Sequence, residues 1–241
     1  MDYGIQMYSV RDITGADLRG ALKKIADIGY KYIEFAGFFG HTAQEVKSWL
    51  DEYGLKISGT HTGLRELEND FEGTLAYHKA IGNPAFIIPG HDLSSQKKLD
   101  EFVEKINFYA PKLEKEGIRI GYHNHSHEFR PNADGSVIHE QLVYRTNLMF
   151  EIDTFWYYNA TGASAVPLLE RLGDRIIGCI HIKDGFRGGE GMPLGCGQAP
   201  VREVYDYCRS KGILMVVESE SLRPDGITEA KICYDYLRAQ E

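Results

Sequence analysis

Short apolar runs alternate with longer amphipathic stretches along this chain. The first run, residues 3–8, precedes residues 16–28, in which Leu18, Leu22 and Ile25 recur at helical spacing before Gly29, a helix C-cap signal. Further apolar runs of strand length occupy residues 32–35, 56–60, 86–88, 118–122, 149–152, 176–182 and 214–217. The helical patterns that follow them occupy residues 43–53, 71–81, 95–116, 137–144, 163–172, 201–210 and 227–237. The pattern therefore predicts eight strand–helix units.

This alternation predicts an α/β fold in which a parallel sheet is covered by helices. A chain of 241 residues has the size of a single (β/α)8 barrel. The alternative is an open doubly wound sheet, but the phosphate-binding loops that often open such sheets, GxGxxG and GxxxxGK(S/T), are absent. No linker, low-complexity segment or block of charge divides the chain, so residues 1–241 are expected to form one domain.

The bulk composition narrows the class of protein. With 43% hydrophobic residues, the chain can bury a full core. Its formal net charge of -8, with no basic run to offset it, would repel phosphates, so no nucleic-acid partner is expected. Residues 1–10 lack signal-peptide features, and no run approaches the roughly 20 apolar residues of a membrane span. We therefore expect a cytoplasmic protein without membrane contact, whose four cysteines are reduced thiols.

Polar side chains able to bind a metal follow four consecutive predicted strands. They are His123, His125 and Glu128 after strand five, Asp153 after strand six, His181 at the end of strand seven and Glu218 after strand eight. The carboxyl ends of neighbouring barrel strands share one rim, so groups from all four are expected to meet around one ion. Carboxylates with imidazole suit a divalent Mn, Mg, Co or Zn ion. Each residue alone is explained more simply as a helix cap or turn residue, and only their coincidence predicts a site.

Several of these residues belong to longer motifs. In chain order the motifs are GIQMYSVRD at 4–12, YHNHSHEF at 122–129, EIDTFW at 151–156, HIKD at 181–184, LGCG at 194–197 and VVESE at 216–220. This ordered set resembles the sugar phosphate isomerase/epimerase-like branch of the xylose-isomerase-like TIM-barrel superfamily, over essentially the whole chain. That superfamily includes sugar isomerases, ketose 3-epimerases, inosose dehydratase and keto-glycoside lyases. Its ketose epimerases hold a metal through Glu, Asp, His and Glu from strands five to eight, which implies Asp153, His181 and Glu218 as ligands here.

Strand five departs from the epimerase pattern. Tyr122 and His123 stand where the epimerases carry their glutamate, which leaves Glu128, His125 and His123 as candidates for the fourth ligand. We favour Glu128, because it would preserve an oxygen-rich coordination sphere. His125 would then act as an acid or base beside the metal, and His123 would contact the substrate.

Further substrate contacts are expected around the same rim. Trp156 replaces a polar histidine of the epimerases and offers a sugar an apolar stacking face, although a role in the core is the plain alternative. Lys183, beside His181, could contact substrate or form an ion pair. Glu34 and His61, after strands two and three, are lesser candidates, and a structural role for His61 is equally reasonable.

The widest irregular stretch, residues 184–200, is glycine-rich and lies between strand seven and its helix. It is expected to form either a mobile lid over the site or a simple surface excursion. Arg187 lies in it, six residues after His181, and matches an arginine that lies near substrate oxygens in the epimerases. A bound sugar would then be anchored by Arg187, whereas a solvated loop arginine is the alternative.

The predicted function is that of a divalent-metal-dependent sugar isomerase or epimerase. The metal would polarise a substrate carbonyl, and proton transfer would pass through a metal-bound enediolate, with Glu218 as ligand and base and His125 as the partner acid. If a β-oxygen substituent left instead, the protein would be a lyase or dehydratase acting on a keto-sugar, keto-glycoside or keto-inositol. This is the main alternative.

Two other classes of protein share features with this chain. Endonuclease IV-like proteins have the same barrel but bind three zinc ions and need a basic groove for DNA, which the net charge of -8 disfavours. A sugar-binding protein without catalysis is also conceivable. The expected partner is therefore a small-molecule sugar, and a homodimer is possible because related barrels often pair.

Overall fold

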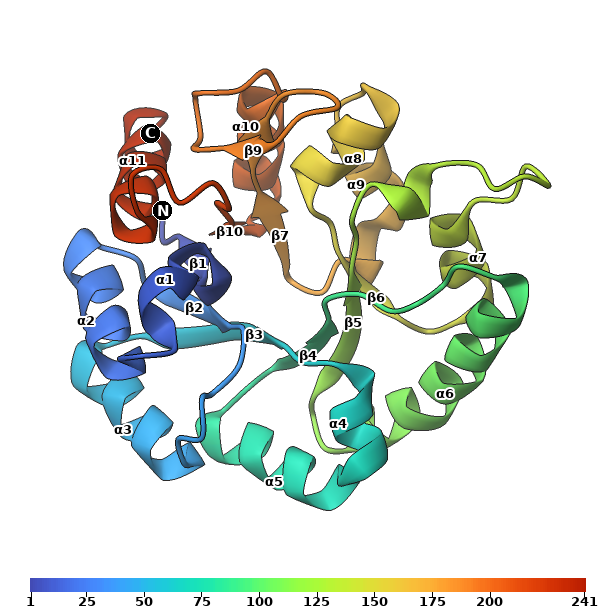
Figure 1. The fold of residues 1–241 in the computed structure, drawn as a ribbon, viewed down its shortest axis with the longest axis horizontal. Coiled ribbons are helices and arrows are strands. Elements are labelled where there is room, and N and C mark those ends of the chain that lie inside the picture. The colour runs from blue at the N-terminus through green and yellow to red at the C-terminus, as the bar shows by residue number, and fades with distance from the viewer.

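The computed structural model describes residues 1–241 as a ring of parallel strands encircled by helices (Figure 1). The barrel strands are β1 (Gly4–Gln6), β2 (Tyr32–Phe35), β3 (Lys56–His61), β4 (Ala85–Ile88), β5 (Arg119–His123), β6 (Met149–Glu151), β7 (Cys179–Ile182) and β10 (Leu214–Val217). They pair in the order β6-β5-β4-β3-β2-β1-β10-β7. Isolated bridges from Phe150 to Ile176 and from Asp153 to His181 join the two ends of this sheet. The predicted (β/α)8 barrel is confirmed.

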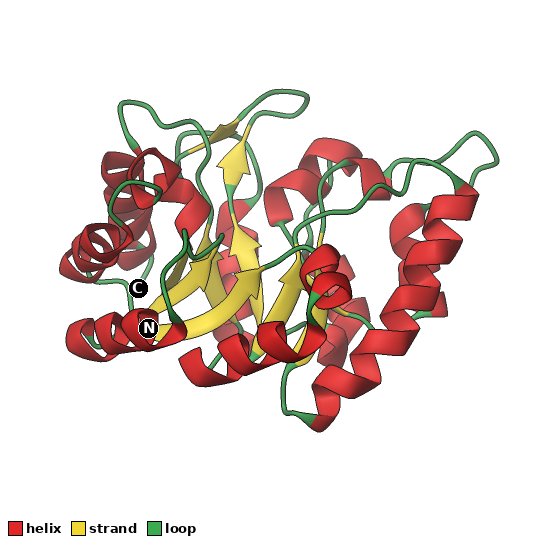
Figure 2. Ribbon diagram, turned by 60° about the horizontal axis from the view of Figure 1, so that its bottom comes forward, coloured by secondary structure: helices red, strands yellow, loops and turns green.

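Helices cover the outside of the barrel, and the strands lie within (Figure 2). The helices are α1 (Arg11–Thr14), α2 (Leu18–Ile28), α3 (Ala43–Tyr53), α4 (Leu64–Asn69), α5 (Phe71–Ile81), α6 (Gln96–Lys115), α7 (Ile138–Arg145), α8 (Thr154–Thr161), α9 (Val166–Leu172), α10 (Val201–Lys211) and α11 (Gly226–Ala239). The predicted helices at 43–53 and 71–81 are found over the same residues. None of the helices combines the length and apolar character needed to span a bilayer.

Helix α8 is the main element that the periodicity does not predict. Its sequence, TFWYYNAT, is rich in aromatic and β-branched residues and has no clear apolar face. The helix begins because the carboxylate of Asp153 accepts the backbone N–H of Trp156 at 2.8 Å, which is an N-cap interaction. Asp153 therefore has a structural role in addition to any role in the site.

The barrel interior has an apolar floor below its polar upper layer. The floor is a separate cluster of five buried residues, namely Ala85, Ile87, Ile177, Cys179 and Val216. Two inward-facing glycines make room for it, because a Cβ at Gly59 would collide with Ile87 and one at Gly121 with Ile177. Polar side chains higher in the barrel consequently rest on packed hydrocarbon.

The glycine-rich stretch 184–200 is tied to the top of the barrel. It contains a small antiparallel hairpin of β8 (Asp184–Gly185) and β9 (Gly191–Met192). The buried carboxylate of Asp184 accepts backbone N–H groups from Gly195, Gly197 and Ala199 at 3.0, 2.9 and 3.0 Å. These bonds hold the base of the loop in one conformation, while the turn of the hairpin is exposed.

Candidate metal centre and active site

Four side chains converge at the carboxyl ends of β5, β6, β7 and β10. They are His123, Asp153, His181 and Glu218, and each offers one atom such that all four atoms lie within 4.8 Å of one another. All four residues are buried. The predicted convergence of Asp153, His181 and Glu218 is therefore present in the fold, together with His123.

Two atoms of this cluster lack hydrogen-bond partners. Oδ2 of Asp153 and Nδ1 of His181 are both buried without a partner, and Nδ1 of His181 lies 3.4 Å from Oε2 of Glu218. Leaving such atoms unsatisfied is costly, so the cluster favours a cation at its centre. Two carboxylates and two imidazoles suit Mn, Co or Zn, and the residues present fit a divalent ion.

Lys183 supplies a fixed positive charge beside this cluster. Its buried Nζ donates to Oε2 of Glu218 at 3.0 Å and to Oε2 of Glu220 at 2.6 Å, and lies 3.5 Å from Oδ2 of Asp153. It also lies 4.8 Å from the centre of the Trp156 ring. Burial lowers the pKa of Lys183, but the neighbouring carboxylates outweigh burial and raise the pKa above its usual value. The ammonium therefore remains charged at neutral pH.

The carboxylates of the cluster differ in their protonation. Burial raises the pKa of Asp153 to about 7, although the charge of Lys183 opposes this shift. Burial acts on Glu218 in the same direction, but Lys183 and His181 hold its pKa well below the usual range. Glu218 is thus ionised at neutral pH, and a cation next to Asp153 would stabilise its ionised form as well.

Glu128, the favoured fourth ligand, lies outside the cluster. Its Oε1 accepts the hydroxyl of Tyr122 at 2.9 Å, and its Oε2 accepts the backbone N–H of His125 at 2.9 Å. The cause is the alternation along β5, where Gly121 and His123 face the barrel interior while Tyr122 packs outward against Phe102 of α6. The strand therefore presents His123 to the cluster, and Glu128 braces the loop that follows.

A second layer of ionisable side chains lies directly beneath the cluster. Nε2 of His61 is 2.7 Å from Oε2 of Glu151 and 2.9 Å from Oε1 of Glu34. Glu34 is fully buried, whereas His61 reaches the cavity above. Glu34 and His61 were both predicted to contact substrate, and of this pair the structure places only His61 at the cavity wall. Glu151 was not predicted, although it stands two residues before Asp153 and strand alternation puts both on one face.

A cavity of about 320 Å³ opens above the cluster, within the range of small-molecule sites. It is lined by Tyr8, Ala36, His61, Pro89, His123, His125, Glu218 and Glu220. His125 lies on its wall, and burial lowers the pKa of this imidazole, which favours the neutral form. Tyr8 and Glu220 were not among the predicted site residues. Tyr8 lies in the 3-10 helix Met7–Val10 that follows β1, where the apolar pattern predicts more strand.

Trp156 lies near this cavity, whereas Arg187 lies away from it. The ring of Trp156 lies 5.9 Å from that of His125, and its indole Nε1 is buried without a hydrogen-bond partner. Arg187 is exposed in the turn between β8 and β9, and its guanidinium packs over Gly162 at the end of α8. The structure thus brings Trp156 close to the cavity but not Arg187.

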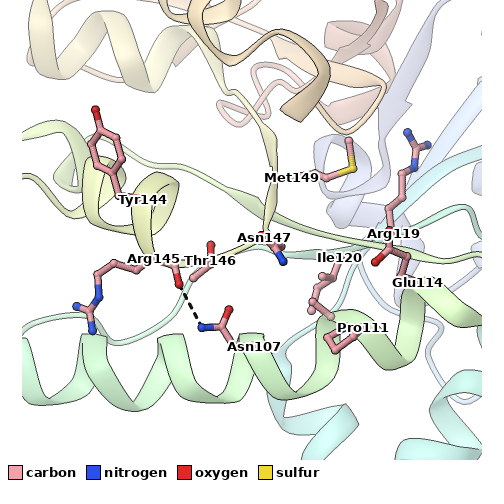
Figure 3. Close-up of a pocket in the computed structure, with 11 residues that line it drawn as sticks. Asn107, Pro111, Glu114, Arg119, Ile120, Tyr144, Arg145, Thr146, Asn147 and Met149 are labelled. Atoms are coloured by element: carbon pink, nitrogen blue, oxygen red, sulfur yellow. Dashed lines mark hydrogen bonds between the residues drawn. The ribbon is translucent and has the colours of Figure 1, made fainter.

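A larger cavity of about 530 Å³ lies elsewhere, between α6 and the start of β6 (Figure 3). Its lining includes Arg119 and Met149, the first residues of β5 and β6, and Asn107, which donates to the carbonyl of Arg145 at 3.1 Å. It therefore lies at the amino end of the barrel strands, whereas barrel active sites lie at the carboxyl end. The smaller cavity is the one with convergent ionisable groups.

Known proteins that are similar to this chain include an isomerase, an isomerase/epimerase and a dehydratase. A curated 2-oxo-tetronate isomerase from Haemophilus influenzae is 27% identical over 180 residues, which cover 64% of this chain and 67% of that protein. The crystal structure of a sugar phosphate isomerase/epimerase from Parabacteroides distasonis has a TM-score of 0.83 at 22% identity, covering 98% of this chain and 96% of the other. That of a probable 3-DHS dehydratase from Bacillus anthracis has a TM-score of 0.75 at 15% identity, covering 99% of each chain.

At such identities the two crystal structures establish a shared fold. The match to a family model is more direct, since it extends over residues 22–237 and the model is described as xylose isomerase-like TIM barrel. Together with the isomerase relative, it supports an enzyme of the sugar-processing type. The chain belongs to the xylose isomerase-like TIM barrel family.

Proposed function

We propose that this protein is a divalent-metal-dependent sugar isomerase or epimerase. The observation that carries the proposal is the buried convergence of His123, Asp153, His181 and Glu218, with unpartnered atoms on Asp153 and His181. These four residues would hold the ion, and His123 takes the place that the sequence motifs suggested for Glu128. A bound divalent ion would polarise a substrate carbonyl and so acidify the adjacent C–H bond.

Two groups at the cavity are suited to move the proton. Neutral His125 can accept it, and ionised Glu218 lines the same cavity. They follow β5 and β10, which β6 and β7 separate in the ring, so they approach a bound sugar from different sides. Return of the proton to the opposite face of the same carbon gives epimerisation, and its delivery to the neighbouring carbon gives isomerisation.

Lys183 would support this chemistry electrostatically. Negative charge develops on the substrate oxygen as the C–H bond breaks, and a fixed ammonium in a buried site stabilises such charge without reorganising. The bonds to Glu218 and Glu220 hold Nζ of Lys183 in place before substrate arrives.

Elimination is the second candidate, and Trp156 favours it. Its indole flanks His125 and could pack against an apolar leaving group next to the proton-transfer residue. The same proton abstraction, followed by loss of a β-oxygen substituent, would make the enzyme a lyase or dehydratase.

A single NMR experiment tests both candidates. The Mn²⁺-loaded protein is incubated in deuterated water with ketoses, 2-oxo-tetronate and 3-keto-glycosides, and is then removed before spectra are recorded. Deuterium at the α-carbon with an unchanged carbon skeleton and hydroxyl count supports isomerisation or epimerisation, whereas loss of water or aglycone supports elimination. The Asp153→Asn variant is the control. If no substrate exchanges deuterium with wild-type protein that demonstrably holds metal, proton-transfer chemistry is contradicted.

A further inference from the structure

Each of the two histidines in the cluster has a buried carboxylate beneath it. Nδ1 of His123 lies 3.1 Å from Oε2 of Glu151. Nε2 of His181 lies 2.8 Å from Oε1 of Glu34 and, at the longer distance of 3.2 Å, from Oε2 of Glu151. Both carboxylates have 0% exposure and cannot touch a substrate in the cavity above. Their partners in the upper layer are therefore the imidazoles themselves.

These contacts determine which ring nitrogen carries the proton. Carboxylate oxygens at these distances are acceptors, so Nδ1 of His123 and Nε2 of His181 are the ring nitrogens placed to donate. Nε2 of His123 and Nδ1 of His181 point away from these carboxylates and are the atoms with a lone pair available to a metal. The second of these is the buried atom without a partner, 3.4 Å from Glu218. A metal requires such a lone pair, and the bond on the far side of the ring fixes both tautomer and orientation.

His61 holds the two carboxylates together. Its Nε2 lies between them, 2.7 Å from Glu151 and 2.9 Å from Glu34, and its ring stacks on that of His181 with centroids 5.2 Å apart. Two further donors reach the layer, while Oε2 of Glu34 has no hydrogen-bond partner. The amide of Gln6 donates to Glu34 at 2.6 Å, and the thiol of Cys179 donates to Oε1 of Glu151 at 3.3 Å.

We propose that Glu151 and Glu34 are positioning residues, one for each histidine ligand: Glu151 fixes His123 and Glu34 fixes His181. His61 bridges the two carboxylates and so holds them at a fixed separation. The inference rests on the ligand set of the proposed function and deepens it, because it states which residues give the site its geometry. It also assigns a role to the buried residues Glu34, His61 and Glu151, which take no part in the proposed proton transfer.

The test measures tautomers and metal affinity, neither of which needs a substrate. Protein with ¹⁵N-labelled histidine is examined by long-range ¹H–¹⁵N NMR, both free of metal and with Zn²⁺, and Zn²⁺ binding is measured by competition with a chelator. Glu151→Met should shift the tautomer of His123, whereas His181 keeps Glu34 as its nearer acceptor. Glu34→Met should leave His123 in place and shift His181 by a smaller amount, because Oε2 of Glu151 remains 3.2 Å from its Nε2. Each should weaken Zn²⁺ binding by roughly 10- to 100-fold.

Conservative variants separate positioning from a general loss of structure. Glu151→Gln keeps an acceptor oxygen under His123 but adds an N–H donor. It should therefore recover most of the Zn²⁺ affinity, while His123 of the metal-free protein shows a mixture of tautomers, and the same holds for Glu34→Gln under His181. If the methionine variants do not fold, a mixed tautomer at only the histidine above each glutamine still supports the proposal. Glu128→Gln is the matched control, since it alters another fully buried carboxylate that touches neither ligand.

Three results would overturn the proposal. They are wild-type tautomers in both methionine variants, Zn²⁺ affinities within threefold of wild type, or two Zn²⁺ ions per wild-type chain with one lost in Glu34→Met, which would make the lower layer a second metal site. Failure of the proposed function is recognised separately. Wild-type protein that binds no metal contradicts that function, while the tautomers of the metal-free protein still decide whether the carboxylates position the rings.

Discussion

Nζ of Lys183 lies 3.0 Å from Oε2 of Glu218, and both side chains are buried beside the candidate metal cluster. A lysine in this position would compete with a metal ion for the same carboxylate, yet it would also supply the positive charge that the proposed reaction needs. The two effects can be separated, because one acts on metal binding and the other on turnover.

Lys183→Met should therefore change the two quantities in opposite directions. Loss of the ammonium leaves more negative charge at the cluster, so Mn²⁺ should bind more tightly than in wild type. Turnover should fall by roughly 100- to 1,000-fold, as for removal of one preorganised stabilising group. Isothermal titration with Mn²⁺ and the rate of deuterium exchange measure the two effects. Lys231→Met, which removes an exposed lysine paired with Asp235, should alter neither.

Replacement of Asp153 should distinguish its two roles. Asn at this position still caps α8, because its side-chain oxygen can accept the N–H of Trp156. Asp153→Asn should accordingly keep the wild-type stability. Its metal affinity should fall by more than the roughly 10- to 100-fold that is typical when a residue behind a metal ligand is changed. Asp153→Ala should lose metal and also about 1 kcal/mol of unfolding free energy. Elemental analysis and urea unfolding report the two quantities, and full metal content in Asp153→Asn would exclude it as a ligand.

The identity of the strand-five ligand is tested by a pair of variants. Glu128→Gln should retain metal. It should lower the free energy of unfolding by about 1–3 kcal/mol, because the hydrogen bonds from Tyr122 and from the N–H of His125 are weakened. His123→Leu should abolish tight metal binding. Metal content after gel filtration is the measurement, and the reverse pattern would restore Glu128 as the ligand.

His78 should give the protein a pH-dependent stability that is independent of the site. Burial lowers the pKa of this imidazole to about 4, and Asn83 lies 2.8 Å from its Nδ1. The folded-state pKa lies below the unfolded value of about 6.5, so folding favours the neutral form. Its contribution is complete above pH 6.5 and is lost as the pH falls towards 4, by about 3 kcal/mol in total. Urea unfolding at pH 7.5 and 4.5 measures this effect. The free energy of unfolding should fall less between these two pH values in His78→Gln than in wild type.

Asp184 should control the mobility of the glycine-rich loop. Asp184→Ala removes the acceptor for the N–H groups of Gly195, Gly197 and Ala199, and should cost about 2–4 kcal/mol of unfolding free energy. The turn of the hairpin should then be cut faster by trypsin after Arg187, which is exposed. Mass spectrometry of timed digests measures the rate. Glu190→Ala, a change in the same exposed turn, should leave it close to wild type.

The sequence predicts the barrel well because its signal is repeated in every unit. Eight apolar runs with eight helical patterns have few ways to pack, and local errors such as the missing α8 do not alter the ring. Helix α8 is not evident in the sequence, because its aromatic residues pack on several sides and leave no apolar periodicity. Its start depends on one N-cap interaction, that of Asp153.

The site is predicted less completely, for reasons specific to each residue. Asp153, His181 and Glu218 converge because each stands at or just after the end of an apolar run. Within YHNHSHEF no apolar pattern marks the last residue of the strand, so alternation alone could not choose between His123 and Glu128. Arg187 lies in the hairpin turn, and the direction of that turn depends on contacts distant in sequence.

The apolar floor formed by Ala85, Ile87, Ile177, Cys179 and Val216 also affects how solvent and ions reach the ligand cluster. Because packed hydrocarbon lies below the cluster, the cavity at the mouth of the barrel is the open approach to it. A sugar bound in that cavity, as proposed, would block the same passage. A divalent ion held by the cluster would then have to bind before the sugar, and it would exchange with solvent only after the sugar had left.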